Sequence, residues 1–241
     1  MESETLLSFE NVSIGYNKSI VINGINLQIN AGQKLAILGR NGVGKTTLMK
    51  GTIGILPIST GSLKLVKKDI TRLPAHNRSK MGIAYVPQGR EIFPELTVKE
   101  NLELGGLQHL KTNTDKSLSD RIDMVTAYFP ELKNHLSRKG GLLSGGQQQQ
   151  LSIARALMSY PKMLLLDEPT DGIQPNVVNK LVETLNKIQE ELNIALIVVE
   201  QNLNFASKIV GEFLILQKGK IVEKGKINEL TDEVKSKYLS V

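Results

Sequence analysis

Cysteine is absent from this 241-residue chain, and aromatic residues make up only 4% of it. Without thiols the chain has no disulfide framework, no thiolate metal site and no cysteine nucleophile. Its longest uninterrupted apolar run, residues 194–199, is far shorter than the roughly 20 residues that span a bilayer. The first four residues are Met-Glu-Ser-Glu, which lack the basic start and apolar stretch of a signal peptide. We therefore expect a soluble intracellular protein.

The composition favours a folded domain. Hydrophobic residues make up 40% and charged residues 22% of the chain, a balance that supplies a core and argues against disorder. The length suits one large domain or one domain with an inserted lobe. The net charge is 30 − 24 = +6. This surplus suits a nucleotide, a nucleic acid or an anionic membrane surface, but a solvated lysine-rich surface would produce it equally well.

Three short apolar runs predict buried strands, at residues 34–38, 163–166 and 194–199. Continuous rather than alternating hydrophobicity is typical of parallel strands that are covered on both faces. Between the last two runs, apolar residues recur at spacings of three and four over 178–192, which predicts a helix that follows Pro175. Strand, helix and strand in this order predict a right-handed crossover within an α/β core.

Both ends of the chain predict antiparallel hairpins. The first joins apolar segments at 6–14 and 20–29, and the second joins 213–216 to 221–222.

The middle of the chain, residues 89–160, has a different character. It contains no strong strand, it includes the polar stretch 111–119, and its apolar residues have helical spacing. We expect a helical lobe inserted here into the α/β core, with all of residues 1–241 forming a single domain.

A glycine-rich segment follows the first apolar run and precedes a segment compatible with a helix. It fits the phosphate-loop pattern of Gly, four residues and Gly-Lys-Thr. Glycines allow successive backbone N–H groups to curl around phosphate oxygens, and the helix N-terminus adds partial positive charge. The residues expected to contact the nucleotide are Gly39, Arg40, Asn41, Gly42, Val43, Gly44, Lys45, Thr46 and Thr47.

The phosphate loop and a pair of carboxylates together predict nucleotide hydrolysis. Lys45 would contact the β- and γ-phosphates, and the Thr46 hydroxyl would bind Mg²⁺. Asp167 and Glu168 follow the second apolar run, at the carboxyl edge where α/β sheets place their sites. Asp167 would hold Mg²⁺, and Glu168 would act as the general base on the attacking water. Taken alone, two acidic residues after a strand are equally consistent with a catalytic pair and with a strand end exposed to solvent.

A phosphate loop is shared by kinases, GTPases, helicases and motors, so a further motif is needed to choose among them. The segment 143–147 reads Leu-Ser-Gly-Gly-Gln and resembles the signature of ATP-binding-cassette (ABC) ATPases. The resemblance covers essentially the whole chain and implies a RecA-like P-loop NTPase core with an antiparallel β subdomain and an inserted helical subdomain. It also implies that Ser144, Gly145, Gly146 and Gln147 begin a helix directed at ATP held by another subunit.

The resemblance assigns three further roles. Tyr16 falls where the family stacks an aromatic ring on adenine. Gln88 matches the glutamine that joins the core to the helical lobe and senses Mg²⁺ and the γ-phosphate. Gln201 falls at the switch position, where most family members have a histidine that contacts the γ-phosphate. Since glutamine donates a hydrogen bond but carries no charge, we expect slower hydrolysis than at a histidine-bearing site.

Departures from the common pattern resemble one branch of the family, the ATPases of importers for branched-chain amino acids, amides and urea. Gln201 is one, and the run Asp-Gly-Ile-Gln at 171–174 is another. The strings at 87–94, 147–150 and 169–175 are most similar to the ATPases of urea importers. No physical argument connects these strings to urea, because this kind of subunit does not touch the solute.

The expected function is that of an ATP-binding and ATP-hydrolysing subunit that powers urea uptake. The alternative is the same role in an importer of branched-chain amino acids or short-chain amides. The expected partner in the ATPase dimer is a sibling ATPase subunit or a second copy of this chain, and the two subunits would enclose two ATP–Mg²⁺. Membrane permease subunits are expected as well. A periplasmic or lipid-anchored solute-binding protein would be an indirect partner. The subunit would lie on the cytoplasmic face of the membrane.

Two rival classes fit less well. A soluble ABC ATPase acting on nucleic acid or ribosomes usually has a long coiled-coil insertion or two cassettes, and this chain has neither, so no nucleic-acid partner is expected. A P-loop small-molecule kinase would lack the segment 143–147.

Overall fold

The computed structural model describes residues 4–17, 19–107 and 117–239. Its strands are β1 (Thr5–Tyr16), β2 (Ser19–Asn30), β3 (Lys34–Leu38), β4 (Ile58–Leu65), β5 (Lys68–Asp69), β6 (Ile83–Val86), β7 (Met163–Asp167), β8 (Ala195–Glu200), β9 (Glu212–Gln217) and β10 (Lys220–Lys226). Its α-helices are α1 (Lys45–Ile53), α2 (Ala75–Lys80), α3 (Val98–Gly106), α4 (Leu118–Tyr128), α5 (Pro130–Lys133), α6 (Gly145–Leu157), α7 (Pro175–Leu192), α8 (Leu203–Ile209) and α9 (Asp232–Tyr238).

A six-stranded sheet forms the centre of the molecule, in the order β10-β9-β3-β8-β7-β6. Strands β9, β3, β8, β7 and β6 are parallel to one another. The edge strand β10 pairs antiparallel with β9. The three apolar runs form β3, β7 and β8, as predicted. The predicted helix between the last two runs is α7, and Pro175 is its first residue. Strand β6 was not predicted from the sequence.

Both faces of this sheet are buried, which explains the continuous apolar runs. Along β3, Leu35 and Ile37 pack on one side with residues of α1 and of the strands β1, β2 and β4. The alternate residues Ala36 and Leu38 pack on the other side with residues of α6, α7 and α8. Along β3, β7 and β8 nearly every residue is therefore removed from water, whichever way its side chain points.

A second, antiparallel sheet has the order β2-β1-β4-β5. The N-terminal hairpin expected from the sequence is β1 paired with β2, and the C-terminal hairpin is β9 paired with β10. The structure adds that β9 is also a parallel neighbour of β3, so this hairpin extends the central sheet.

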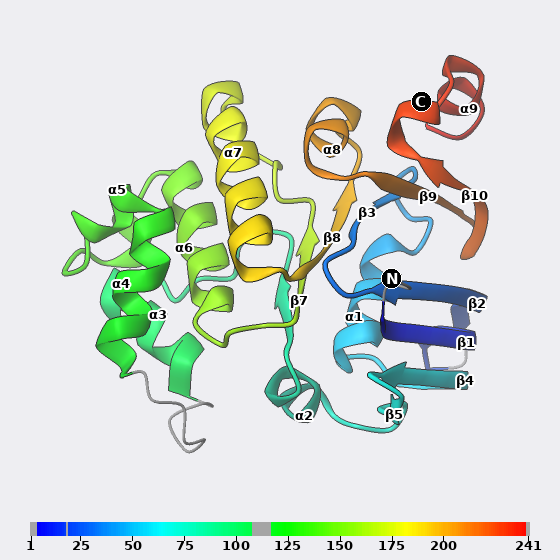
Figure 1. Ribbon diagram of the computed structural model, residues 1–241, viewed down its shortest axis with the longest axis horizontal. Helices are drawn as coiled ribbons and strands as arrows, with labels where there is room; N and C mark the ends of the chain where they lie inside the picture. The colour runs from blue at the N-terminus through cyan, green and yellow to red at the C-terminus, as the bar shows by residue number, and fades with distance from the viewer. Residues whose placement is uncertain (1–3, 18, 108–116, 240–241) are drawn as a thin grey trace.

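Helices α3, α4, α5 and α6 gather at one end of the molecule, and the antiparallel sheet lies at the other (Figure 1). These helices fall within the range where a helical lobe is expected. Of the polar stretch 111–119, most lies outside the described residues, and α4 begins at Leu118. The architecture is the predicted α/β core with an antiparallel sheet and an inserted group of helices.

No helix in the described ranges is both long and apolar enough to cross a membrane.

A buried arginine fixes the far end of the phosphate-loop helix. The Arg78 side chain is only 1% exposed, and it donates hydrogen bonds to the carbonyl oxygens of Gly51 and Thr52 in the last turn of α1 and to those of Thr71 and Leu73. Burial lowers the pKa of Arg78 to about 10, so the group stays charged at neutral pH. A cation at a helix C-terminus also interacts favourably with the helix dipole.

Replacement of this arginine by an apolar side chain, Arg78→Met, is expected to lower the free energy of unfolding by at least about 3 kcal/mol, because four carbonyl oxygens each lose a charged donor. Urea denaturation measures this change. The matched control is Arg72→Met, since Arg72 is exposed and its loss should cost at most about 0.5 kcal/mol. Equal effects of the two substitutions would contradict the structural role of Arg78.

Candidate active site

The phosphate loop joins β3 to α1, and its path requires glycine at two positions. Gly39 has a φ of 150° and Gly44 a φ of 108°. A Cβ at Gly39 would lie 2.5 Å from the carbonyl oxygen of Leu216, and a Cβ at Gly44 would lie 2.7 Å from Cδ1 of Ile22. The chain therefore turns where a side chain cannot fit, and it enters a helix whose first N–H groups have no partner within the helix.

Lys45 is the first residue of α1 and is almost fully buried. Its ammonium group donates hydrogen bonds to the carbonyl oxygens of Gly39 at 2.8 Å and Arg40 at 3.0 Å. It also lies 3.7 Å from a carboxylate oxygen of Glu168. Burial lowers the pKa of Lys45, and the nearby carboxylates of Glu168 and Asp167 oppose this shift. The loop thus holds a desolvated cation in contact with its own backbone.

Asp167, the last residue of β7, is 1% exposed and accepts two hydrogen bonds from hydroxyl groups. Thr46 donates to Oδ1 at 3.2 Å, and Tyr85 donates to Oδ2 at 3.0 Å. Burial raises the pKa of Asp167, while the two hydroxyl donors lower it. Burial and the neighbouring Asp167 charge raise the pKa of Tyr85, so its hydroxyl remains a donor at neutral pH.

Glu168 is the point at which several elements meet. Its carboxylate accepts hydrogen bonds from Gln88 at 3.0 Å and from Gln201 at 3.0 Å. The Gln201 amide donates at 2.7 Å to Asn41 of the phosphate loop as well. Glu168 itself has a φ of 48°, an uncommon conformation for a residue other than glycine. Strain of this kind persists only where surrounding contacts hold the backbone in place.

A cavity of about 310 Å³ opens beside these groups. It is lined by Val21, Asn41, Gly42, Gly44, Lys45, Thr46, Thr47, Gln88 and Glu168. All of these except Val21 were candidate site residues from the sequence, so the fold brings residues from four separate segments to one place. Asp167 and Gln201 do not line the cavity but contact residues that do.

Other candidates lie elsewhere in the structure. Gly39, Arg40 and Val43 belong to the loop without lining the cavity, and Arg40 is exposed. Tyr16 ends β1 with 46% of its surface exposed, and it does not line the cavity either.

The signature segment also lies outside the cavity, at the N-terminus of α6. Ser144 is the N-cap residue, and its hydroxyl accepts a hydrogen bond from the Gln147 N–H at 3.3 Å. The Gln147 side chain accepts in return from the Ser144 N–H at 3.1 Å. Ser144 is exposed, and Gly145 and Gly146 are half-buried. The first turn of α6 therefore presents N–H groups at the surface rather than to this chain's own phosphate loop.

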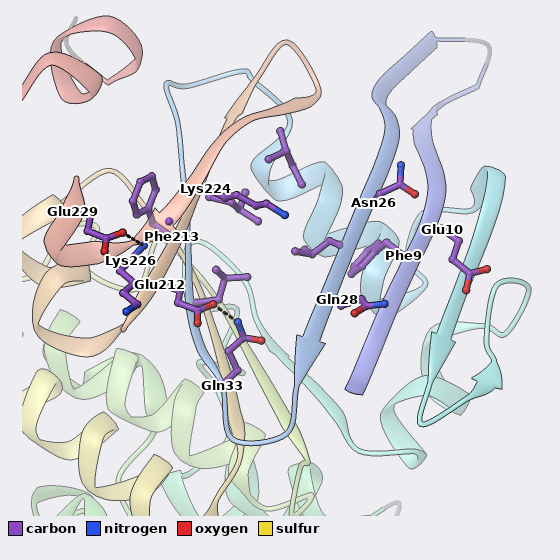
Figure 2. Close-up of a pocket in the computed structure, with 15 residues that line it drawn as sticks. Phe9, Glu10, Asn26, Gln28, Gln33, Glu212, Phe213, Lys224, Lys226 and Glu229 are labelled. Atoms are coloured by element: carbon purple, nitrogen blue, oxygen red, sulfur yellow. Dashed lines mark hydrogen bonds between the residues drawn. The ribbon is translucent and has the colours of Figure 1, made fainter. Parts of the chain in front are cut away.

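A larger cavity, of about 700 Å³, lies between β1 and β2 on one side and β9 and β10 on the other (Figure 2). Phe9 and Phe213 contribute to its floor and are each 4% exposed, so they are already packed in the core. On its rim Gln33 donates a hydrogen bond to Glu212. It holds none of the sequence-predicted site residues, so the chemistry belongs to the smaller cavity.

Three polar residues of the site carried no separate assignment from the sequence. Tyr85 donates to Asp167, as described above. Asp171 accepts a hydrogen bond from Gln88 at 3.3 Å. Arg90 donates to the carbonyl oxygens of Asp171 and Gly172. Each is close in sequence to a recognised motif residue, and this proximity is the signal that would have pointed to them.

Comparison with known proteins shows the family to which the chain belongs. A family model described as ABC transporter matches residues 22–171. The chain is 37% identical to the high-affinity branched-chain amino acid transport ATP-binding protein BraG of Pseudomonas aeruginosa, over 90% of this chain and 91% of that protein. It is 35% identical to a probable branched-chain amino acid transport ATP-binding protein, LivF of Archaeoglobus fulgidus, over 95% of both.

Solved structures give the same fold. A nucleotide-free ATP-binding cassette from an ABC transporter is 25% identical with a TM-score of 0.81, over 98% of this chain and 96% of that one. A dimeric ATP-binding cassette in a post-hydrolysis state with ADP and phosphate is also 25% identical with a TM-score of 0.81, over 92% and 99%. The predicted fold class is confirmed.

Loss of one hydroxyl donor to Asp167, in Tyr85→Phe, is expected to lower the free energy of unfolding by about 1–3 kcal/mol, because a buried carboxylate loses a charge-assisted hydrogen bond. Chemical denaturation of the nucleotide-free chain gives the value. Tyr16→Phe removes the same atom at an exposed position and should change stability by at most about 0.5 kcal/mol. The assignment of Tyr85 is wrong if its variant is as stable as the control.

Proposed function

The chain belongs to the ABC transporter family and is an ATPase of that family, and on this premise we propose that it is the ATP-hydrolysing subunit of an importer. The observation that carries the proposal is the convergence on Glu168. Lys45 of the phosphate loop, Gln88 after β6 and Gln201 after β8 all contact this carboxylate, so a group bound at the loop would be close to a base and to two amide donors.

The phosphate loop supports the assignment of ATP as substrate. The N–H groups of the first turn of α1 and the Lys45 ammonium are suited to the β- and γ-phosphates. Phosphate oxygens would replace the carbonyl oxygens of Gly39 and Arg40 as acceptors for Lys45. This exchange is favourable because charged phosphate is a stronger acceptor than a neutral carbonyl.

Thr46 and Asp167 fit Mg²⁺. Their oxygen atoms lie 3.2 Å apart, with the hydroxyl proton already directed to the carboxylate, which leaves the hydroxyl lone pairs for a cation. No group of three or more His, Cys, Asp or Glu residues that could hold a metal ion is found in the described part of the chain. Mg²⁺ suits this arrangement, since it is usually bound by one or two protein groups plus substrate phosphates and water. When bound, Mg²⁺ would neutralise charge on the phosphates.

Glu168 is suited to the proton transfer. Water attacks the γ-phosphorus, the bond to the bridging oxygen of ADP breaks, and the water proton moves to the Glu168 carboxylate. Lys45 stabilises negative charge on the phosphate oxygens. Gln88 and Gln201 donate to Glu168 and so orient it. Gln201 is neutral and contributes a hydrogen bond, where a histidine would add charge.

The exposed helix N-terminus at Ser144 supports a dimeric mechanism. Its N–H groups do not face this chain's own loop, so they are available to a nucleotide on a second cassette. We propose that two cassettes, two copies of this chain or this chain and a sibling, close on two ATP molecules. Tighter binding of ATP to the closed pair would drive the membrane permease subunits at the cytoplasmic face. A solute-binding protein would deliver the solute on the other side.

The solute favoured by the comparisons is a branched-chain amino acid, because both BraG and LivF carry that name and match nearly the whole chain. Urea, the first expectation from the sequence, is the second candidate. Urea is supported only by the sequence similarity of the segments 87–94, 147–150 and 169–175. No structural contact bears on the choice, since this kind of subunit does not touch the solute.

Two substitutions separate ATP binding from hydrolysis. Lys45→Ala is expected to abolish detectable ATP binding, because Lys45 is the only cation among the described residues that line the cavity. Glu168→Gln should retain ATP binding while turnover falls by about 10²–10⁴-fold, since the general base is lost. Phosphate release and the affinity for a fluorescent ATP analogue measure the two effects. Full activity of Glu168→Gln would rule out the general-base role.

Uptake of labelled leucine and labelled urea at low concentration identifies the solute. Cells of the native host that carry the intact gene are compared with cells carrying Lys45→Ala. Leucine uptake should disappear in the variant while urea uptake is unchanged. The reverse result would establish urea as the solute, and loss of neither would contradict the importer assignment.

A further inference from the structure

Glu200 is a buried carboxylate that the reaction described above does not use. It is the last residue of β8 and is 3% exposed. Among the described residues it has no salt bridge within 4.0 Å. Burial raises its pKa, and hydrogen bonds from its neighbours oppose that shift. A buried carboxylate without a cation is costly unless its oxygens are fully hydrogen-bonded.

Both oxygens of Glu200 are used by donors from two different segments. Oε1 accepts from the N–H of Thr170 at 3.1 Å and from its hydroxyl at 2.7 Å. Oε2 accepts from the N–H of Gln201 at 3.0 Å and that of Asn202 at 3.1 Å. Thr170 lies two residues after Glu168 in the sequence, and Gln201 contacts the Glu168 carboxylate.

We propose that Glu200 is a positioning residue for ATP hydrolysis, which joins the segment after Glu168 to the segment that carries Gln201 and so fixes the Glu168 carboxylate between them. The inference rests on the proposed function and deepens it. Glu168 has a φ of 48° and its N–H is bonded to the Val199 carbonyl oxygen at 2.9 Å. The Glu200 bonds to Thr170 add the constraint on the following segment that such a conformation needs.

The hydrogen bonds between Glu200 and Thr170 also affect Gln88. The next residue after Thr170 is Asp171, whose carboxylate accepts from Gln88 at 3.3 Å. Gln88 donates to Glu168 as well. Displacement of Thr170 would therefore disturb Gln88 and Gln201, two of the three donors that surround the Glu168 carboxylate. Among the described residues, Glu200 makes no hydrogen bond to the phosphate loop.

A glutamine cannot replace this carboxylate, although it has the same shape. If its NH₂ group occupied the Oε2 position, it would face the N–H groups of Gln201 and Asn202. If it occupied the Oε1 position, it would face the N–H of Thr170. Either orientation sets donor against donor and deprives at least one of these N–H groups of its acceptor.

The test is Glu200→Gln in the full chain, with turnover and nucleotide affinity measured separately. We expect kcat to fall by about 10–100-fold while the affinity for ATP changes by less than about threefold, because Glu200 makes no hydrogen bond to the phosphate loop among the described residues. Thr170→Val, which removes one donor and keeps the volume, should lower kcat by a few-fold with the affinity unchanged. Glu212→Gln is the matched control, since Glu212 is an exposed glutamate at the start of β9.

A double-mutant cycle shows whether Glu200 acts through Gln201. Glu200→Gln should cost much less in a Gln201→Ala background than in the wild type, because the residue that it positions is then already gone. Equal cost in both backgrounds, or unchanged kcat in Glu200→Gln and Thr170→Val, would overturn the proposal.

A readout independent of activity separates this inference from the proposed function. Amide hydrogen exchange at residues 170, 201 and 202 should be at least about tenfold faster in Glu200→Gln than in the wild type, with no change in α1. A wild-type chain without ATP turnover would contradict the proposed function, while unchanged exchange at these amides would contradict the role of Glu200.

Discussion

Hydrogen bonding to the Glu168 carboxylate is the interaction on which the site depends. Gln88 and Gln201 reach it from the ends of β6 and β8, and the Lys45 ammonium lies 3.7 Å away at the start of α1. These three groups are also the ones suited to a nucleotide phosphate. In the mechanism that we propose, bound ATP takes over the Lys45 ammonium while Gln201 stays on Glu168, so the same group of residues couples nucleotide binding to readiness for hydrolysis.

The fold makes this convergence possible through parallel strand order. Because β3, β8, β7 and β6 are parallel neighbours, their carboxyl ends meet at one edge of the sheet and deliver the phosphate loop, Gln201, Asp167 with Glu168, and Gln88 to the same place. Both faces of these strands pack against the hydrophobic core. The signature helix α6 lies away from the cavity, and its N-terminus is at the surface. This placement is the one required by a mechanism in which a second cassette supplies the nucleotide.

Much of this arrangement could be predicted from the sequence, and the limits have physical reasons. The phosphate loop and the Asp167–Glu168 pair were recognisable because their chemistry depends on local spacing directly after short, continuous apolar runs. Tyr85 and Glu200 were missed because a hydrogen bond between distant segments leaves no periodic signal in the sequence. The solute could not be derived at all, since an ATPase subunit of this kind is not expected to contact it.

The central claim is tested most directly by the structure of the Glu168→Gln chain with ATP and Mg²⁺. The account predicts phosphates at the first turn of α1 within hydrogen-bond distance of the Lys45 ammonium. It also predicts that residue 168 faces the γ-phosphate and remains in contact with Gln201. A nucleotide bound elsewhere, or a residue 168 turned away from the γ-phosphate, would contradict it.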